Sequence, residues 1–505
     1  MSLAIVRTRA QVGIQAPQVT VEVHLSSGLP TMHIVGLPEA AVKESKDRVR
    51  SAILNSNYLF PAKKITVNLA PADLPKEGGR YDLAIALGIL AAAEIIPATL
   101  FDQHEFIGEL ALSGELRPVR GVLSGAIQCQ HAKRILIIAP ANAEEASLCQ
   151  GAQQKSARSL LEVCAYLYGQ TNLEDVDNLE PPEVITQHAD LNEVRGQAQA
   201  KRALEITAAG KHNLLFIGPP GTGKTMLASR LPGILPPMSE AEALESAAIY
   251  SISLQQDGWL KRWRQRPFRS PHHTASGISL VGGGGKPRPG EISLAHGGIL
   301  FLDELPEFSR KVLDVLREPL ESGKICIARS SRQVTYPARF QLVAAMNPCP
   351  CGYYGDASSK CTCTEEQIKR YQGQASGPLL DRIDLQVEVP PIAITELQGP
   401  NQNPQEDSAQ VQGRVLKAWK IQTLRQHCAN GQLSNAQIEA FCQLSKDDEN
   451  LLRLAIEKLD LSARAYHRVL KISRTIADLE GSIDIKTGHI MEALSYRKLE
   501  RYRQV

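Results

Sequence analysis

The amino-acid sequence predicts an α/β protein with a parallel sheet in its central region and an all-helical C-terminal region. Three apolar runs in the central region alternate with helical patterns, as they do in parallel α/β domains. These predicted strands are Leu214–Ile217, Ile299–Leu302 and Gln341–Ala345. In the C-terminal region, Ser462 is a candidate N-cap for a helix ending near Gly481, and Thr487 could cap the last helix.

The N-terminal region mixes predicted strands and helices. Residues Gln18–Leu25 alternate apolar and polar side chains, which is the pattern of a half-buried strand. Two shorter runs, Ile65–Leu69 and Arg134–Ile138, also predict strands. The ranges Ala40–Leu54 and Tyr81–Ala93 have helical spacing.

Composition excludes several classes of protein. The 505 residues are 43% hydrophobic and 22% charged, which is ordinary for a folded globular protein, and the net charge is only +2. Nucleic-acid binding would therefore need local basic surfaces.

The longest apolar run, Leu83–Ala93, is far shorter than the ~20 residues that span a membrane. The apolar stretch Leu3–Val6 is too short for a signal peptide, so we expect a cytoplasmic protein without a membrane partner.

Two polar stretches divide the chain into three predicted domains. The range 171–190 is acidic, and no Lys or Arg occurs between Arg158 and Arg195. The range 397–410 is polar and contains two prolines, so both stretches have the composition of exposed linkers. The predicted domains are residues 1–170, 191–396 and 411–505.

The segment GPPGTGKT follows a predicted strand and precedes a helical run, which is the setting of a phosphate-binding loop. Its residues are Gly218, Pro219, Pro220, Gly221, Thr222, Gly223, Lys224 and Thr225. The glycines let backbone N–H groups face phosphate oxygens. Because Lys224 would contact the β- and γ-phosphates and Thr225 would ligate Mg²⁺, the segment predicts ATP and Mg²⁺ as cofactors.

The predicted strand Ile299–Leu302 ends in two carboxylates, Asp303 and Glu304. Ligands of an open parallel sheet bind at the carboxyl ends of its strands. We therefore expect Asp303 to hold Mg²⁺ through water, and Glu304 to polarise the water that attacks the γ-phosphate.

Together the two motifs resemble those of the AAA+ ATPases, and further segments match that pattern. Asn347 ends the segment QLVAAMNP and resembles the polar sensor that orients the attacking water. Arg382, in PLLDRIDL, resembles the arginine finger that reaches the ATP of a neighbouring subunit. Such a finger implies a ring, and the resemblance implies a hexamer.

Two more segments resemble parts of the AAA+ nucleotide pocket. Arg464, in SARAYH, is similar to the second sensor arginine of a helical lid, and His467 and Arg468 compete for that role. The segment VRGQ resembles the entry to the adenine pocket. Its expected nucleotide-binding residues are Val194, Gly196 and Gln197.

A Gly-rich insert at 267–298 and a predicted hairpin at Lys324–Phe340 resemble the helix-2 insert and the pre-sensor-1 hairpin of magnesium chelatases and minichromosome-maintenance helicases. In the hairpin, Ile325 and Ile327 are expected to pair with Val334 and Tyr336. Basic residues in the two elements predict contacts with DNA phosphates, with solvated turns as the alternative. These residues are Lys286, Arg288, Arg329 and Arg332. Nothing near His272 and His273 completes a metal site, so we expect both to be structural.

Four cysteines are crowded into the segment NPCPCGYYGDASSKCTC, directly after Asn347. They are Cys349, Cys351, Cys361 and Cys363. Four thiolates suffice for tetrahedral Zn²⁺, and a cytosolic cluster favours metal over disulfides, although the C-x-C spacing is tighter than usual. A structural zinc is the prediction, and a redox pair or free thiols are the alternatives.

Two N-terminal segments, LPKEGGRYDLAIALGIL and IGELALSGELRPVRGV, resemble the proteolytic domain of Lon. Arg80 occupies the position of the protease's serine and Gly125 that of its lysine. Without nucleophile or base, proteolysis has no chemistry. The resemblance implies an inactive Lon-like domain that serves as a scaffold or a nucleic-acid surface.

An inactive Lon-like domain joined to a chelatase-like AAA+ module with a four-cysteine insert resembles the ComM/YifB family. That resemblance implies a hexameric DNA helicase that promotes branch migration during natural transformation. The expected partners are single-stranded and branched DNA, further copies of the chain and recombinase machinery. An ATP-driven chelatase-like or chaperone-like motor acting on a protein is the alternative.

Overall fold

The computed structural model describes residues 3–176, 188–253, 258–284, 287–329, 332–355, 360–392, 406–459 and 462–497. The chain forms two compact units. The first comprises residues 1–185 and 240–263, and the second comprises residues 186–239 and 264–505. No helix in the described ranges is long and apolar enough to cross a bilayer.

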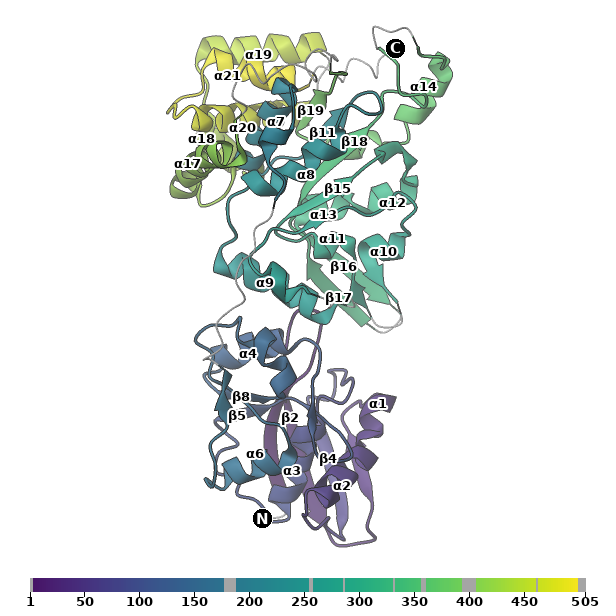
Figure 1. Cartoon of the computed structure of the whole chain (residues 1–505), viewed down its shortest axis with the longest axis vertical. Coiled ribbons are helices and arrows are strands. Elements are labelled where there is room, and N and C mark those ends of the chain that lie inside the picture. The colour runs from purple at the N-terminus through teal and green to yellow at the C-terminus, as the bar shows by residue number, and fades with distance from the viewer. Residues whose placement is uncertain are drawn as a thin grey trace. The chain divides into compact units, whose positions relative to one another are not determined.

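The first unit contains two four-stranded sheets (Figure 1). One has the order β1-β2-β4-β3 and consists of β1 (Leu3–Arg9), β2 (Gln18–Ser26), β4 (Lys64–Ala70) and β3 (Met32–Val35). The other has the order β10-β9-β8-β5 and consists of β10 (Glu174–Asp175), β9 (Gln154–Ser156), β8 (Ile135–Ile138) and β5 (His104–Phe106). A buried ion pair between Arg9 and Glu105, with Nε and Oε2 2.6 Å apart, joins β1 to β5. Strands β2, β4 and β8 confirm the strands predicted near residues 18, 65 and 134.

The helices of the first unit cover these sheets, and α3 packs on β1 and β2. The helical elements are α1 (Ala40–Lys43), α2 (Ser45–Asn55), α3 (Asp82–Ala92), α4 (Val122–His131), η1 (Pro140–Asn142), α5 (Ala143–Ala146) and α6 (Leu160–Leu167), with a short ribbon of β6 (Glu109–Leu110) and β7 (Leu116–Arg117). The helical spacing at Ala40–Leu54 is confirmed, as two consecutive helices, α1 and α2, interrupted at Glu44. There Ser45 and Arg48 turn their side chains to the buried carboxylate of Asp82.

The segment 240–263 also belongs to the first unit, although it follows the phosphate-loop segment in the chain. It contains α9 (Glu240–Ile252) and η4 (Leu260–Arg262). Helix α9 packs against α4, and the Ser251 hydroxyl donates to the buried carboxylate of Glu145. Burial raises the pKa of Glu145, and the Ser251 hydroxyl and the Leu123 N–H offset part of that rise. The sequence gives no sign of this long-range packing.

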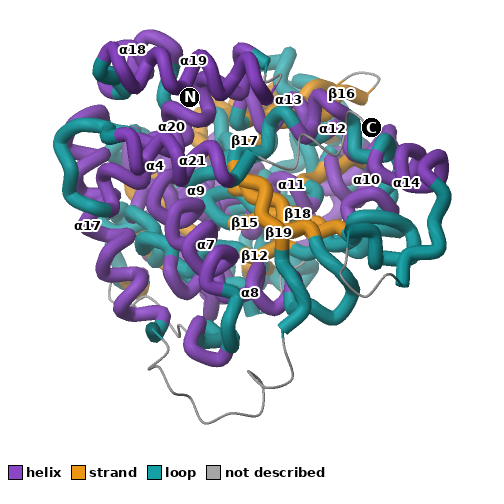
Figure 2. The backbone as a smooth tube through the Cα atoms, turned by 90° about the horizontal axis from the view of Figure 1, so that it is seen from above, coloured by secondary structure: helices purple, strands orange, loops and turns teal. Residues whose placement is uncertain are grey.

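The second unit is built on a parallel five-stranded sheet, with four of its strands labelled in Figure 2. The order is β12-β15-β18-β11-β19. The strands are β12 (Phe268–Arg269), β15 (Ile299–Leu302), β18 (Gln341–Met346), β11 (Leu214–Ile217) and β19 (Leu385–Glu388). The three strands predicted in the central region are confirmed. Their carboxyl ends share one edge of the sheet, where the structure places the phosphate loop.

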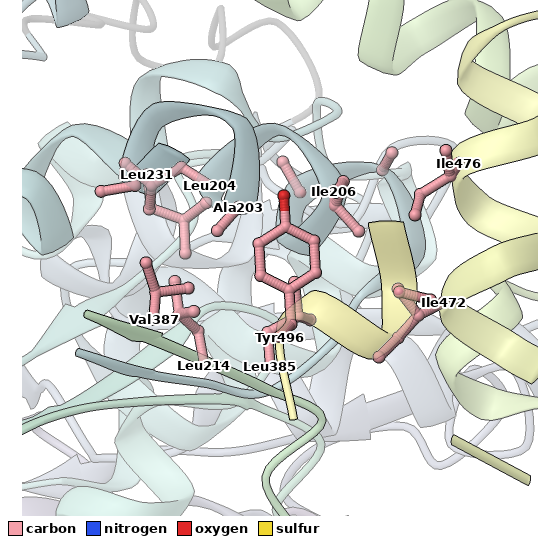
Figure 3. Close-up of a cluster of buried hydrophobic side chains, with 14 of the residues drawn as sticks. Ala203, Leu204, Ile206, Leu214, Leu231, Leu385, Val387, Ile472, Ile476 and Tyr496 are labelled. Atoms are coloured by element: carbon pink, nitrogen blue, oxygen red, sulfur yellow. The ribbon is translucent and has the colours of Figure 1, made fainter. Parts of the chain in front are cut away.

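Helices cover this sheet, and one face carries the main core of the unit. The elements before and between the strands are η3 (Leu191–Glu193), α7 (Ala198–Gly210), α8 (Lys224–Ile234), α10 (Gly277–Val281), α11 (Glu291–Leu294), η5 (Leu305–Glu307), α12 (Arg310–Val315), α13 (Arg317–Ser322), α14 (Glu365–Gln372) and α15 (Gly377–Leu380). Leu214 and Leu385 point into the core from neighbouring strands. Figure 3 shows Tyr496 in the same cluster with Ile472 and Ile476.

The C-terminal region of the second unit is helical, as predicted. It contains α17 (Ser408–Gln426), η6 (Asn430–Gln432), α18 (Asn435–Phe441), α19 (Lys446–Leu459), α20 (Ala463–Leu479) and α21 (Thr487–Ser495). Ser462 caps α20 by accepting the Ala465 N–H, as expected. The cap predicted at Thr487 is wrong by one residue, since Lys486 is the N-cap and the Thr487 hydroxyl donates to Asp448 instead.

Two short hairpins complete the second unit and pack against each other. One pairs β13 (Gly282–Gly283) with β14 (Arg288–Pro289), and the other pairs β16 (Lys324–Arg329) with β17 (Arg332–Pro337). In the second hairpin the register joins Ile325 to Tyr336 and Ile327 to Val334, as predicted. The Tyr336 hydroxyl donates to the carbonyl oxygen of Pro287, which links the hairpins.

Candidate nucleotide-binding site

The phosphate loop leaves β11 and leads directly into α8 at Lys224. Gly221 and Gly223 have φ values of +79° and +87°, a region that glycine adopts without a steric penalty. At Gly218 an added Cβ would lie 2.2 Å from the carbonyl oxygen of Val389, so only glycine fits there. The loop therefore has the curled backbone that cradles phosphates.

Lys224 begins α8 and contacts its own loop and Asn347. Its ammonium donates to the carbonyl oxygens of Gly218 and Pro219 at 2.7 and 2.8 Å, and to Asn347 Oδ1 at 3.0 Å. Burial lowers the pKa of Lys224, while the charges of Asp303 and Glu304 oppose that shift. The expected sensor residue thus contacts the expected phosphate-binding lysine.

The expected magnesium-binding residues are also together. The Thr225 hydroxyl donates to Asp303 Oδ2 at 2.6 Å. A hydroxyl and a carboxylate from the ends of α8 and β15 are hard oxygen donors, which is the ligand chemistry that Mg²⁺ prefers. Glu304 follows directly and has a positive φ of +52°, and its carboxylate lies against His273.

The expected adenine-side residues lie at the start of α7. Val194 is buried in the main core, Gly196 has a φ of +59°, and Gln197 is the N-cap of α7. The Gln197 side chain donates to the carbonyl oxygen of Pro390 at 2.7 Å. This bond ties the VRGQ segment to the chain just beyond β19.

Arg382 lies away from this cluster, at the opposite end of the sheet. The parallel register aligns Leu214 with Leu385, so Arg382 precedes the amino end of β19, whereas the phosphate loop follows the carboxyl end of β11. The four residues of β11 alone span roughly 10 Å between these ends. The Arg382 guanidinium donates to Glu321 and to the carbonyl oxygen of Pro378.

Arg464 and Arg468 both lie on α20, one turn apart, but in different surroundings. Arg464 is exposed, whereas Arg468 is partly buried and its Nη1 lies 3.3 Å from Asp384 Oδ1. Arg468 thus forms an ion pair within the fold, and Arg464 remains the predicted second sensor arginine. His467 is partly buried beside Tyr466.

Sequence reasoning missed two residues that organise this part of the unit, Asn213 and Asp384. The Asn213 side chain donates to the carbonyl oxygen of Arg382 and accepts the Leu342 N–H, while its own N–H donates to Asp384. Burial would raise the pKa of Asp384, but Arg468, His212 and the Asn213 N–H hold that pKa well below its ordinary value. In the sequence, these two residues are marked only by their position directly before a strand.

The four cysteines predicted to bind zinc lie together. Cys349 Sγ is 3.3 Å from Cys351 Sγ and 3.8 Å from Cys361 Sγ, and the four sulfur atoms lie within 4.8 Å of one another. Hydrogen bonds from the N–H groups of Tyr353 and Thr362 lower the pKa of Cys351 to about 6. Four converging thiols fit a tetrahedral metal ion such as Zn²⁺.

The cysteine cluster packs directly on the phosphate loop. A Cβ at Gly352 would lie 2.5 Å from Cδ of Pro220, so the two backbones approach closely. A pocket of about 790 Å³ lies on the sheet face opposite the main core. Gly218 and Pro219 from the phosphate loop and Tyr354 and Gly355 from the cysteine loop line this pocket. The phosphate loop and the cysteine loop therefore line the same pocket.

The basic residues expected to contact DNA can be placed only in part. Arg288 lies on β14, opposite Gly283. Lys286 lies outside the described residues. The backbones of Arg329 and Arg332 are paired at the end of the second hairpin, and their side chains lie outside the description. The two hairpins are adjacent, because a Cβ at Gly282 would lie 2.8 Å from Cδ1 of Ile327.

The two positions of the expected inactive protease site lie in the first unit. Arg80 is buried and donates to Gln11 Oε1 at 3.1 Å, and Gly125 lies in α4. A Cβ at Gly125 would lie 2.8 Å from Cδ1 of Ile107. Neither position carries a nucleophile or a base.

Comparisons with known proteins match all three parts of the chain. Three family models match, described as magnesium chelatase, subunit ChlI (residues 190–397), subunit ChlI of Mg-chelatase (residues 21–143), and magnesium chelatase, subunit ChlI C-terminal (residues 405–497). The similarity therefore extends over both the N-terminal region and the nucleotide-binding segment.

Two of the similar proteins match along nearly their whole length. The uncharacterized protein YifB of Salmonella typhimurium is 54% identical over 99% of this chain and 98% of its own. The competence protein ComM of Haemophilus influenzae is 53% identical over 100% of this chain and 99% of its own. A magnesium-chelatase 38 kDa subunit of Rhodobacter capsulatus is 28% identical over 38% of this chain and 54% of its own.

Proposed function

The chain belongs to the ComM/YifB family of magnesium-chelatase-like AAA+ proteins, and on this basis we propose that it is a ring-forming, ATP-driven DNA translocase. Its proposed activity is branch migration during recombination and the integration of transforming DNA. The name of the Haemophilus relative, a competence protein, supports this direction.

The observation that carries the ATPase proposal is the convergence of four side chains at one edge of the sheet. Lys224 contacts Asn347, and Thr225 contacts Asp303, although these pairs are far apart in sequence. In the proposed reaction, Lys224 binds phosphate oxygens, Asn347 and Glu304 orient the water, and Thr225 and Asp303 hold Mg²⁺. A Mg²⁺ ion held by these two residues would neutralise charge on the phosphates.

The position of Arg382 supports a ring, because Arg382 lies too far along the sheet to contact a phosphate bound by its own chain. A neighbouring copy could present its Arg382 to that phosphate and supply the missing cation. In this arrangement Arg382 leaves Glu321, its partner within the chain.

The DNA proposal rests on the two adjacent hairpins, which carry the basic residues identified in the sequence. Backbone-tracking hairpins bind phosphates without reading bases, so the proposed substrate is single-stranded or branched DNA of any sequence. The matches to magnesium chelatase favour a second candidate, a remodelling motor that acts on a protein.

ATP hydrolysis by the full-length protein, measured with and without single-stranded DNA, separates the two candidates. A translocase should hydrolyse faster on DNA and move three- and four-stranded junctions, with Lys224→Ala as the inactive control. Neutralising Arg288, Arg329 and Arg332 together should flatten the slope of log K against log[salt] by about 0.7 per lost single-strand phosphate contact. If DNA does not change the rate of ATP hydrolysis and the junctions are not moved, the remodelling motor is favoured.

A further inference from the structure

The arginine proposed to reach a neighbouring copy lies on a short connection between α15 and β19. Residues 381–384 form this connection. The Arg382 side chain is only 10% exposed, and its guanidinium donates to the carboxylate of Glu321 and to the carbonyl oxygen of Pro378. The guanidinium must leave both partners to reach another chain. The direction in which it leaves therefore depends on how the backbone of Arg382 is held.

The Asn213 side chain holds that backbone. Its Nδ2 donates to the carbonyl oxygen of Arg382 at 2.9 Å, and its Oδ1 accepts the N–H of Leu342 on β18 at 2.8 Å. Because a carbonyl oxygen only accepts and a backbone N–H only donates, the two bonds fix the orientation of the amide. Asn213 thus ties the backbone of Arg382 to a central strand of the sheet.

Further hydrogen bonds hold the rest of the connection. The Asn213 N–H donates to Asp384 Oδ2 at 2.9 Å, and the Asn213 carbonyl oxygen accepts the N–H groups of Asp384 and Leu385 at 3.1 and 3.0 Å. The buried Arg497, just beyond α21, donates through Nη1 to the carbonyl oxygens of Ile383 and Asp384 at 2.7 and 3.2 Å. The backbone of the connection is therefore fixed, and Asn213 provides the bond at Arg382 itself.

Asn213 lies at the opposite end of β11 from the phosphate loop. It directly precedes Leu214, the first residue of the strand, whereas the loop begins at Gly218, after the last residue. The four strand residues span roughly 10 Å. A change at Asn213 therefore acts on the Arg382 of its own chain before it acts on the phosphate loop of that chain.

We propose that Asn213 is a positioning residue for Arg382, and that it sets the direction in which the guanidinium reaches the ATP of a neighbouring copy. The inference rests on the proposed ring-forming ATPase and extends it. In this arrangement Asn213 touches no phosphate and transfers no proton. A chain altered at Asn213 keeps a working phosphate loop but presents a misplaced Arg382, so the defect appears in the site of the neighbouring copy.

Two substitutions remove the hydrogen-bond donor to Arg382. Asn213→Asp keeps the acceptor for the Leu342 N–H and places an oxygen that repels the Arg382 carbonyl oxygen. Asn213→Ala removes the donor without adding a charge. Asn142→Asp is a matched control in the first unit, because the buried Asn142 amide also bridges a backbone donor and a backbone acceptor, the N–H and the carbonyl oxygen of Val119, at 3.0 and 2.9 Å.

The first measurements are ATP binding, assembly, and steady-state kcat and KM for ATP on full-length chains. Both Asn213 variants should bind ATP and assemble as the wild type does. Their kcat should fall about 10²-fold at unchanged KM, because misplacing a reacting group by about 1 Å has an effect of that size. Asn142→Asp should match the wild type.

Mixtures of chains then show which site the substitution affects. Mixed with Lys224→Ala chains, which carry an intact Arg382, the Asn213 variants should regain part of the activity. Mixed with Arg382→Ala chains, they should not, because neither chain then presents a correctly placed arginine. Arg382→Ala mixed with Lys224→Ala is the positive control for subunit exchange. In a single chain, Asn213→Asp with Arg382→Ala should be no slower than Arg382→Ala alone, since no guanidinium is left to position.

Several results would overturn the inference. Recovery with Arg382→Ala but not with Lys224→Ala would show that Asn213 acts on the phosphate loop of its own chain. Wild-type kcat in both Asn213 variants, loss of folding or ATP binding in both, or no recovery where the positive control recovers would also overturn it. If the positive control itself does not recover, a further large fall in kcat of the double variant would overturn it.

Failure of the proposed function gives different results. A wild-type protein without ATPase activity contradicts the proposed function itself. An Arg382→Ala chain with wild-type kcat contradicts the role of Arg382, whatever the Asn213 variants do. With an active wild type and a slow Arg382→Ala chain, the Asn213 variants test the inference alone.

Discussion

At the scale of single residues, the site separates binding from hydrolysis. Lys224 contacts carbonyl oxygens of its own loop and the amide of Asn347, whereas Glu304 contacts none of these groups in the described structure. Removing the charge of Glu304 should therefore leave nucleotide binding intact, while removing Lys224 should abolish it. The two residues can be tested independently.

Glu304→Gln should bind ATP with wild-type affinity and lower kcat by about 10²–10⁴-fold, because an amide orients water poorly and accepts no proton. Equilibrium binding of a fluorescent ATP analogue and single-turnover hydrolysis measure the two effects. Lys224→Ala serves as the non-binding control. Normal hydrolysis by Glu304→Gln would assign the role of Glu304 to another residue.

At the scale of elements, the cysteine loop is a support for the phosphate loop. Gly352 packs on Pro220, and the loop begins directly after Asn347, which contacts Lys224. A metal ion that fixes the four sulfur atoms would also fix this packing. Nucleotide affinity should therefore depend on the cysteines, although no cysteine contacts the nucleotide in the proposed site.

Freshly purified protein should contain about one zinc ion per chain, measured by elemental analysis. Cys361→Ser should lose zinc and bind ATP more weakly, because the loop behind Pro220 loses its cross-link. Cys326→Ser, a partly buried cysteine on β16, is the control and should keep both properties. Zinc-free protein from a chelator-free preparation would argue against the metal.

The ion pair between Asp384, just before β19, and Arg468 on α20 should make the second unit sensitive to acid. Because the pKa of Asp384 is lowered in the folded state, its stabilisation is complete above the unfolded value of about 3.9 and is lost as pH falls below it. Asp384→Asn should cost about 3 kcal/mol at neutral pH and flatten this acid dependence. Denaturant unfolding at several pH values measures both effects. Asp314→Asn, which removes an exposed ion pair with Arg317, should change little.

The sequence predicted those elements that are specified by residues close to one another in the chain. The register of the second hairpin follows from alternating apolar residues, and the phosphate loop from its glycines and its neighbouring strand. Contacts made by the fold could not be predicted in this way. Ser45 contacts Asp82, His273 contacts Glu304 and α9 contacts α4, and each contact joins segments that are separate in the sequence.

At the scale of the whole molecule, the position of Arg382 makes a prediction about assembly. Arg382→Ala should bind ATP and assemble but hydrolyse roughly 10³–10⁵-fold more slowly, because the transition state loses a cation. Mixed with Lys224→Ala chains, it should regain part of the activity, since one interface then combines an intact phosphate loop with an intact Arg382. ATPase titration of the mixture measures the recovery. No recovery despite proven subunit exchange would show that Arg382 acts within its own chain, or that several adjacent sites must be intact.

Because α9 belongs to the first unit, it affects the order in which the two units can fold during synthesis. The first unit includes residues 240–263, so the polypeptide passes between the units three times. During synthesis the chain emerges from its N-terminus at about 5–20 residues per second, and domains generally fold as they become complete. The first unit is not complete when residue 185 has emerged, because α4 still lacks α9 and Glu145 still lacks Ser251. The ribosome must therefore make the phosphate loop before the N-terminal unit can close.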